Sequence, residues 1–146
     1  MKIVAVFLSL FLIILLFNSN HEFTKEELYG RYTRSNKEIK QEFILLPNSI
    51  FRQNILNAKT LDTLHINYGK WTLDSKSRFG QLGLRNYFPF LNMYYMKQSL
   101  VDEKAIKSRL DNGHFNLNKT ILGDIEIEFS EFGRVAYRFK KVEEQK

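Results

Sequence analysis

The sequence predicts a mainly β protein, an antiparallel meander of about eight short strands that closes into a small barrel or packs as a sandwich. Two observations predict this class. Short runs of alternating apolar and polar residues recur from Tyr32 to Val142, with turn residues such as Pro47-Asn48 between them. No linker rich in Pro, Gly or Ser and no internal repeat interrupts these runs, so residues 24–146 are expected to form a single domain.

The amino terminus is a separate apolar segment. Residues 3–17 carry no charge and follow Lys2, which is the order found in a secretory signal or an uncleaved membrane anchor. As a helix this run would reach about 22 Å, short of a hydrocarbon core of about 30 Å but long for a signal core. Signal peptidase prefers small residues, whereas the best cleavage site, after Ser19, has the bulky Phe17 two residues earlier.

We therefore expect residues 1–20 to be a hydrophobic helix, either a signal peptide or a membrane anchor, with retention favoured over removal. The basic flank should stay in the cytoplasm and the domain should be exported. A retained segment would hold the domain against the membrane, facing the periplasm or the cell exterior. Cleavage would instead release a secreted domain.

Composition limits how the domain is stabilised and what it binds. The chain has no cysteine, so an exported domain of this size must depend on its core, and most of the 13 Phe and all 7 Tyr lie in that domain. The net charge of +6 could favour an anionic surface such as phospholipid headgroups or cell-wall polymer. It could equally be a solvated basic surface that binds no partner.

Two short helices are expected beside the strands. Thr24, with Glu27 three residues later, forms a capping box that predicts a helix ending at Gly30. Helical spacing of apolar residues predicts one inserted helix within residues 99–112, with Gly113 as its stop.

The strand pattern near Gly69 changes phase. Before it, alternation predicts that Leu64, Ile66 and Tyr68 point inward while the polar residues between them point outward. After it, Trp71 resumes the alternation one step out of phase. A bulge or a tight turn at Gly69 would explain the shift.

The last two runs predict a half-buried hairpin with an acidic strand beside a basic one. Ile125, Ile127 and Phe129 alternate with acidic residues, and the run from Arg134 alternates apolar with basic residues. Pairing Phe129 with Val135 brings the apolar sets onto one face, because opposed residues of an antiparallel pair share a face. That register places Glu126 opposite Arg138 and Asp124 opposite Lys140.

Several of these residues resemble the lipocalin or calycin family, over most of the chain from Thr24 to Val142. The "LYGRY" stretch after a short helix is similar to the opening Gly-x-Trp motif, with Gly30 and Tyr32 at the matching positions. "YGKW", with Gly69 and Trp71, resembles a second Gly-x-Trp strand, and "GRVAYRFKK" resembles the closing strand. The resemblance implies a lipocalin-like barrel in which Arg138, or less well Arg134, packs over Tyr32. The middle lipocalin motif is not found.

No chemical motif identifies an enzyme. None of the three histidines has a partner at a spacing that suggests a metal or a catalytic site, and nucleophile-elbow, P-loop, zinc-protease and paired-cysteine motifs are lacking. We therefore expect no enzymatic activity, no metal and no cofactor.

The stretch "NYFPFLNMYYM" is the candidate binding segment, because it is rich in aromatic residues and Met around Pro89, which disfavours a central strand. It is expected either to cover the barrel mouth as core, or to form a ligand wall or a partner surface. The candidate binding residues are Tyr87, Phe88, Phe90, Met93, Tyr94 and Tyr95.

Together these features suggest a non-enzymatic, exported binding domain for an apolar small ligand, with the membrane as a contact of its amino-terminal segment. The alternative is a protein-interaction module of the inhibitor or immunity type that uses an exposed aromatic patch. Export argues against nucleic acid as a partner.

Overall fold

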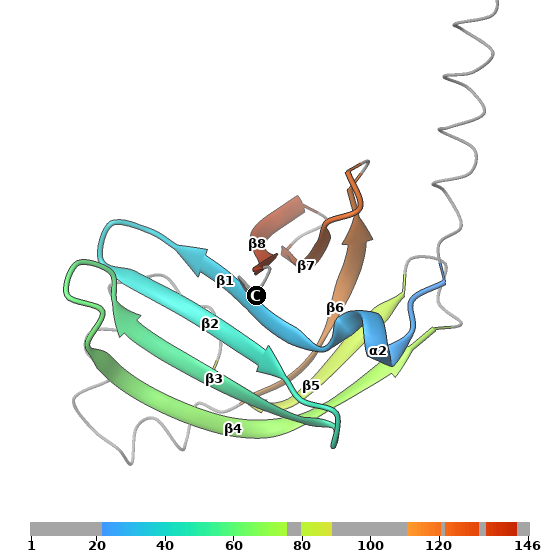
Figure 1. The fold of residues 1–146 in the computed structure, drawn as a ribbon, viewed down its shortest axis with the longest axis horizontal. Helices are drawn as coiled ribbons and strands as arrows, with labels where there is room; N and C mark the ends of the chain where they lie inside the picture. Colours follow the sequence, from blue (N-terminus) through green and yellow to red (C-terminus); the bar gives the residue numbers. More distant parts are fainter. Residues whose placement is uncertain (1–21, 76–79, 89–110, 121, 132–133, 143–146) are drawn as a thin grey trace, which may run out of the picture.

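The protein is a closed antiparallel β-barrel, and the sandwich is excluded. The computed structural model describes residues 22–75, 80–88, 111–120, 122–131 and 134–142. Each strand pairs with the next, and β8 returns to pair with β1 (Figure 1). The strands are β1 (Gly30–Ser35), β2 (Ile39–Leu45), β3 (Ile50–Asn57), β4 (Thr63–Asp74), β5 (Gln81–Tyr87), β6 (Asp111–Lys119), β7 (Ile125–Glu131) and β8 (Arg134–Val142).

Helix accounts for little of the described chain. The one-turn helix α2 (Lys25–Leu28) carries the capping box of Thr24 and Glu27. Strand β6 contains Gly113, so the expected helix stop at that residue is wrong. The rest of the inserted helix and the apolar amino-terminal helix lie outside the described residues. Within the part of the chain that is described, no helix is both long and apolar enough to cross a membrane.

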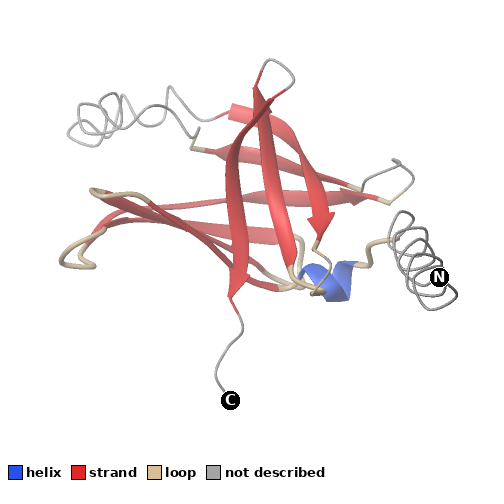
Figure 2. Cartoon of the chain, turned by 90° about the horizontal axis from the view of Figure 1, so that it is seen from above, coloured by secondary structure: helices blue, strands red, loops and turns tan. Residues whose placement is uncertain are grey.

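Helix α2 closes one end of the barrel, which we call the closed end (Figure 2). The side chains of Phe23 and Leu28 are buried and belong to the hydrophobic core. Trp71 on β4 packs edge-on against Tyr29 at 6.0 Å and donates its indole N–H to the carbonyl of Leu46 at 3.0 Å. The helix, the β2–β3 turn and β4 are therefore held together by one buried tryptophan.

Lys141, rather than Arg138, is the basic residue that packs over Tyr32. Tyr32 is fully buried and donates its hydroxyl to the carbonyl of Leu28 at 3.0 Å. Lys141 pairs with Tyr32 across the β1–β8 ladder, has its Nζ 6.0 Å from the ring, and donates to the carbonyl of Glu27. These two bonds satisfy carbonyls at the end of α2. Arg138 lies on the outer face, because its position alternates with that of Lys141.

Aromatic side chains fill much of the barrel interior. Seven large side chains are less than 2 % exposed, namely Trp71, Tyr32, Phe43, Phe51, Phe88, Phe115 and Phe139. Phe43 makes edge-on contacts with Phe51 at 5.5 Å and with Phe139 at 5.2 Å. An eight-stranded barrel is just wide enough to be filled by its own side chains, and this one is filled in that way around these rings.

Strand β4 has the opposite orientation to the one predicted before Gly69. Leu64, Ile66 and Tyr68 are exposed on the outer face, at 44 %, 42 % and 58 %. His65 and Asn67 therefore share the inner face with Trp71, and the alternation runs without a break from His65 to Trp71. The irregularity in this ladder falls instead at Ile55 and Leu56 of β3.

Gly69 is needed for a close approach, not for a turn. A Cβ at this position would lie 2.1 Å from the carbonyl oxygen of Arg85 and 2.5 Å from the Phe51 ring. Phe51 stands directly opposite Gly69 in the ladder and is fully buried. The missing side chain thus makes room for that ring, and together they help to fix the register of β4.

The charged hairpin of β7 and β8 forms, but its register differs by two residues from the prediction. Glu126 stands opposite Lys140, and Glu128 stands opposite Arg138. One residue of the difference arises at the turn, where Glu131 pairs with Arg134, and the other arises from a register shift between Phe129 and Ser130. Arg138 Nε lies 2.8 Å from Glu128 and 3.8 Å from Glu126. Acidic side chains of β7 therefore face basic side chains of β8, as expected.

A buried carboxylate on β2 links side chains of β1, β2 and β3 on the outer face of the barrel. Glu42 is only 6 % exposed, although its position faces outward. Its Oε1 lies 3.0 Å from Lys40 Nζ and 4.0 Å from Arg31, while Asn54 donates to Oε2. Burial by itself would raise the pKa of Glu42, but hydrogen bonds from Lys40 and Asn54 and the charges of Lys40 and Arg31 outweigh it and lower the pKa.

We predict that Tyr32→Phe destabilises the protein by about 1–3 kcal/mol, because a buried carbonyl loses its donor. Lys141→Met should act on the same helix end, and the two changes should show a coupling of about 0.5 kcal/mol or more in urea unfolding. Arg138→Ala is the control and should cost under about 1 kcal/mol, as an exposed ion pair does. Coupling of Tyr32 to Arg138 instead would contradict the placement of Lys141.

The lowered pKa of Glu42 predicts a pH-dependent stability. A carboxyl with a depressed folded-state pKa stabilises the protein above its ordinary value of 4.5, and this contribution is lost as the pH falls through the folded-state pKa. Glu42→Gln should therefore lower the free energy of unfolding by about 1–2 kcal/mol at pH 7, and by much less near pH 3. Urea titrations at both pH values test this, with the exposed Glu26→Gln as control. An equal loss at both pH values would show that the charge is not responsible.

Candidate functional site

The end of the barrel away from α2, which we call the open end, is where inward-facing side chains remain partly exposed. Here β1 finishes at Ser35 and β6 begins at Asp111. Arg34, His65 and Tyr137 point inward by strand alternation, yet each keeps some solvent exposure. Nearer the closed end, inward side chains such as Phe43 and Trp71 are buried. The three open-end side chains therefore keep contact with solvent while facing the interior.

The chain crosses the interior at this end immediately after β5. Asn86 has a left-handed backbone (φ 62°) and lies where the β5–β6 register shifts, so two consecutive side chains, those of Tyr87 and Phe88, become buried. Gln53 of β3 holds this segment with two hydrogen bonds: its amide donates to the Phe88 carbonyl at 2.9 Å and accepts from the Phe88 N–H at 2.8 Å. Asn67 of β4 donates to the carbonyl of Asn86. Two inward-facing polar side chains, those of Gln53 and Asn67, thus bind the backbone of the segment Asn86–Phe88.

Two of the six candidate binding residues therefore lie inside the barrel. Tyr87 and Phe88 are 4 % and 1 % exposed, so their rings belong to the interior and not to an exposed aromatic patch. Burial, and to a smaller extent the charge of Asp111, raises the pKa of Tyr87 to about 12. The other four, Phe90, Met93, Tyr94 and Tyr95, lie outside the described residues.

A row of aromatic rings runs from Tyr87 across β6 and β7 to β8. Successive ring centres are 5.2 Å apart for Tyr87–Phe115, 5.7 Å for Phe115–Phe129 and 5.7 Å for Phe129–Tyr137, and the last pair is stacked at 23°. Phe129 and Tyr137 are only partly buried, whereas Phe115 is fully buried. The row therefore leads from the packed interior to a partly exposed pair of rings.

Arg34 ends this row at the junction of the first and last strands. The β1–β8 ladder covers three residue pairs and stops at Thr33 and Lys140. Beyond it, the guanidinium carbon of Arg34 lies 3.9 Å from the centre of the Tyr137 ring. Burial lowers the pKa of Arg34, and the proximity of Tyr137 partly offsets this. We call Arg34, Gln41, Phe129 and Tyr137 the open-end corner; Gln41 is the buried neighbour of Arg34 on β2.

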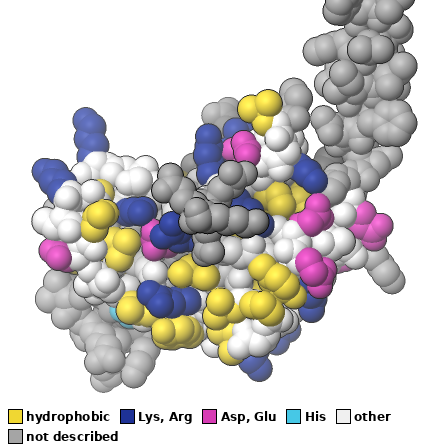
Figure 3. Space-filling model, in the orientation of Figure 1, with side chains coloured by type: hydrophobic (Ala, Val, Ile, Leu, Met, Phe, Trp, Pro, Cys, Tyr) yellow, Lys and Arg dark blue, Asp and Glu magenta, His cyan; other side chains and the backbone are white. Residues whose placement is uncertain are grey.

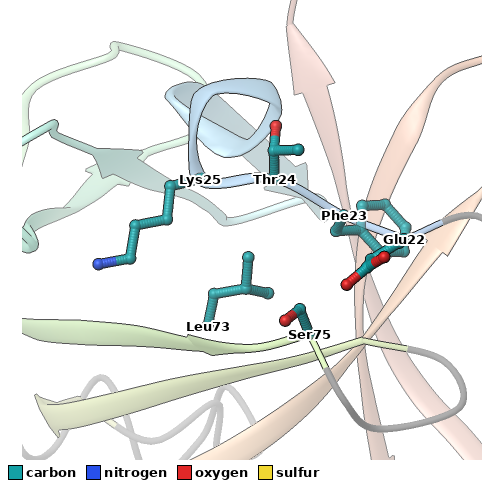
Figure 4. Close-up of a pocket in the computed structure, with 6 residues that line it drawn as sticks. All are labelled: Glu22, Phe23, Thr24, Lys25, Leu73 and Ser75. Atoms are coloured by element: carbon teal, nitrogen blue, oxygen red, sulfur yellow. The ribbon is translucent and has the colours of Figure 1, made fainter.

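The second candidate site is a hollow at the closed end, with a volume of about 390 Å³ (Figure 4). It is lined by the segment Glu22–Lys25, where the chain enters the barrel, and by Leu73 and Ser75 at the end of β4. Its size would admit a small molecule. Its charged groups, however, are the opposite charges of Glu22 and Lys25 on one short segment, and the ammonium of Lys25 lies 5.9 Å from the Trp71 ring. We regard it as the groove left by chain entry.

The outer face of β4 presents a third candidate. Leu64, Ile66 and Tyr68, which we call the β4 stripe, are exposed side by side along one strand face. Figure 3 shows hydrophobic side chains gathered over β3 and β4, with basic side chains among them. Contiguous exposed apolar residues of this kind are typical of interaction surfaces.

The described residues do not form a metal-binding cluster. Among them, no cluster of three or more His, Asp or Glu could hold a metal ion. His114 is exposed on the outer face of β6, and His65 packs 6.1 Å from the Phe88 ring. The inward polar side chains of β3 and β4 whose bonds are described above hold backbone groups.

Comparison with family models, with curated proteins and with solved structures finds no match to this chain. The candidate site therefore depends on its geometry alone. Sequence reasoning missed Arg34, Phe129 and Tyr137 as neighbours, because a closed barrel joins the first strand to the last. It also missed Gln53, although polar residues at inward positions of β2 to β4 were a signal that the interior is polar there.

Proposed function

We propose that this protein is a non-enzymatic binding domain of lipocalin-like build that takes a small, largely apolar ligand at the open-end corner. The observation that carries the proposal is the stacked pair Phe129–Tyr137, whose rings stay partly exposed while facing the interior. Such rings offer a flat apolar wall, and nearby polar groups give it orientation, as in ligand sites generally.

The ligand proposed here is shorter than one that fills a barrel from end to end. Seven large side chains fill the interior and are almost fully buried, and the crossing segment Asn86–Phe88 takes up part of the open end. What supports the lipocalin-like build is the local geometry of α2, Tyr32 and Lys141, which places a cation over the first-strand aromatic. We further propose that residues 1–20 keep the domain at the outer side of a membrane.

We predict that the protein, isolated from membranes and transferred to lipid nanodiscs, retains a small apolar molecule in native mass spectrometry. The intact mass should be that of the full chain, 17.4 kDa, if the amino-terminal segment is retained. Tyr137→Leu should reduce the ligand-bound fraction, whereas Tyr68→Leu, which changes a tyrosine on the outer face, should not. A protein that is ligand-free in wild type and inert to apolar probes would exclude the ligand function, and a smaller mass would exclude the anchor.

The β4 stripe favours a second candidate, a protein-interaction module. Its three side chains keep more than 40 % exposure each, which is unusual for adjacent apolar positions of one strand. The patch differs from the one expected around Phe90, but the class of function is the same.

For this second candidate, we predict that Ile66→Ser with Tyr68→Ser abolishes capture of a partner protein by the purified domain. The free energy of unfolding should change by about 0.5 kcal/mol or less per site, because exposed side chains contribute little. A loss of several kcal/mol would show that the stripe is covered in the native protein. Unchanged capture would remove the interaction role from this face.

A further inference from the structure

Arg34 is an inward-facing cation without an acidic partner in the described part of the chain, where no carboxylate lies within 4 Å of it. Several other basic residues of β1, β2 and β8 have partners. Arg31 and Lys40 face Glu42, Arg138 faces Glu128, and Lys141 donates to a helix carbonyl. Among the described residues, the contact shown for the Arg34 guanidinium is the Tyr137 ring, 3.9 Å away.

A half-buried guanidinium has more hydrogen-bonding capacity than one ring can use. The ring face attracts the cation, which contributes about 0.5–2 kcal/mol according to burial. It cannot serve the five N–H donors of the guanidinium, whose geometry matches a carboxylate or a phosphate. Gln41, the cross-strand neighbour of Arg34, adds an amide at the same corner.

Among the acidic residues at this end, Asp111 lies at the opposite limit of the aromatic row. Asp111 pairs with Tyr87, and Tyr87 begins the row that ends at Tyr137 under Arg34. The corner therefore combines an apolar wall of Phe129 and Tyr137 with a positive charge, and the rings between separate the carboxylate of Asp111 from it.

We propose that the open-end corner binds a small amphipathic anion, with Arg34 holding its carboxylate or phosphate and the rings of Phe129 and Tyr137 packing on its apolar body. This rests on the proposed ligand-binding function and names the class of ligand. It assigns Arg34 as the residue that determines specificity.

The test uses the full-length protein in lipid nanodiscs, with empty nanodiscs as blank. Binding of 2-naphthoate and of its neutral isostere 2-naphthamide is measured by calorimetry, and decanoate provides a chain-like body in place of the rings. We expect naphthoate to bind at least about tenfold more tightly than naphthamide, the usual effect of a charged hydrogen bond. Arg34→Gln should abolish this preference, and Arg34→Lys should reduce it.

The matched control is Arg138→Gln, which removes the same charge from the outer face and should leave the preference intact. Both affinities are measured on the same preparation of each variant. Partial unfolding of a variant lowers both affinities equally and does not change their ratio. Equal binding of both naphthyl probes, or a preference that survives Arg34→Gln, would overturn the role of Arg34 and leave the ligand site in place. Absence of binding by all three probes would overturn the ligand site as well.

Discussion

The end of helix α2 is the constraint on which the barrel depends. Two donors, the buried hydroxyl of Tyr32 on β1 and the partly buried ammonium of Lys141 on β8, bond to the carbonyls of Leu28 and Glu27. One helical turn thereby joins the first strand to the last. The ladder between these two strands has three residue pairs and is the shortest in the barrel. At the other end the β1–β8 ladder stops at Thr33, and Arg34 contacts the Tyr137 ring of β8.

Strand β4 carries the second constraint, and both proposed functions follow from it. A shift of one residue would bury Leu64, Ile66 and Tyr68 and expose the polar residues between them, as the hydrophobic pattern alone would favour. That shift is prevented by the buried indole of Trp71 and by the fit of Phe51 over Gly69. The strand therefore places polar groups in the open end, where Asn67 binds the backbone of the crossing segment, and an apolar stripe on the outside. A local pattern that conflicts with the fold in this way is expected at functional surfaces.

The sequence allowed the fold class, the single meander and the acidic–basic hairpin to be predicted, because each depends on local alternation and on turn residues. The inner face of β4 could not be predicted from the sequence. Alternation defines the two faces of a strand, but it does not say which face points inward when the interior is partly polar. The hairpin register was missed by two residues, one at the turn and one at a bulge between Phe129 and Ser130 that leaves no mark in composition. Lys141 was overlooked beside Arg138, although the alternation that places Tyr137 and Phe139 on the inner face also places Lys141 there and Arg138 on the outer face.

The division of the interior also limits what the protein can bind. Burial of seven large side chains consumes the volume that a long hydrocarbon ligand would need, and Gln53 fixes Phe88 across part of what is left. Among the described residues, the corner between β1 and β8 keeps inward-facing side chains partly exposed, and two rings stand beside one guanidinium there. A wholly apolar ligand would leave that guanidinium desolvated without an acceptor, which is unfavourable, whereas an anionic group would supply the acceptor that Tyr137 cannot. Charge and packing at the corner therefore favour the same class of ligand, a short molecule with an apolar body and a negative end.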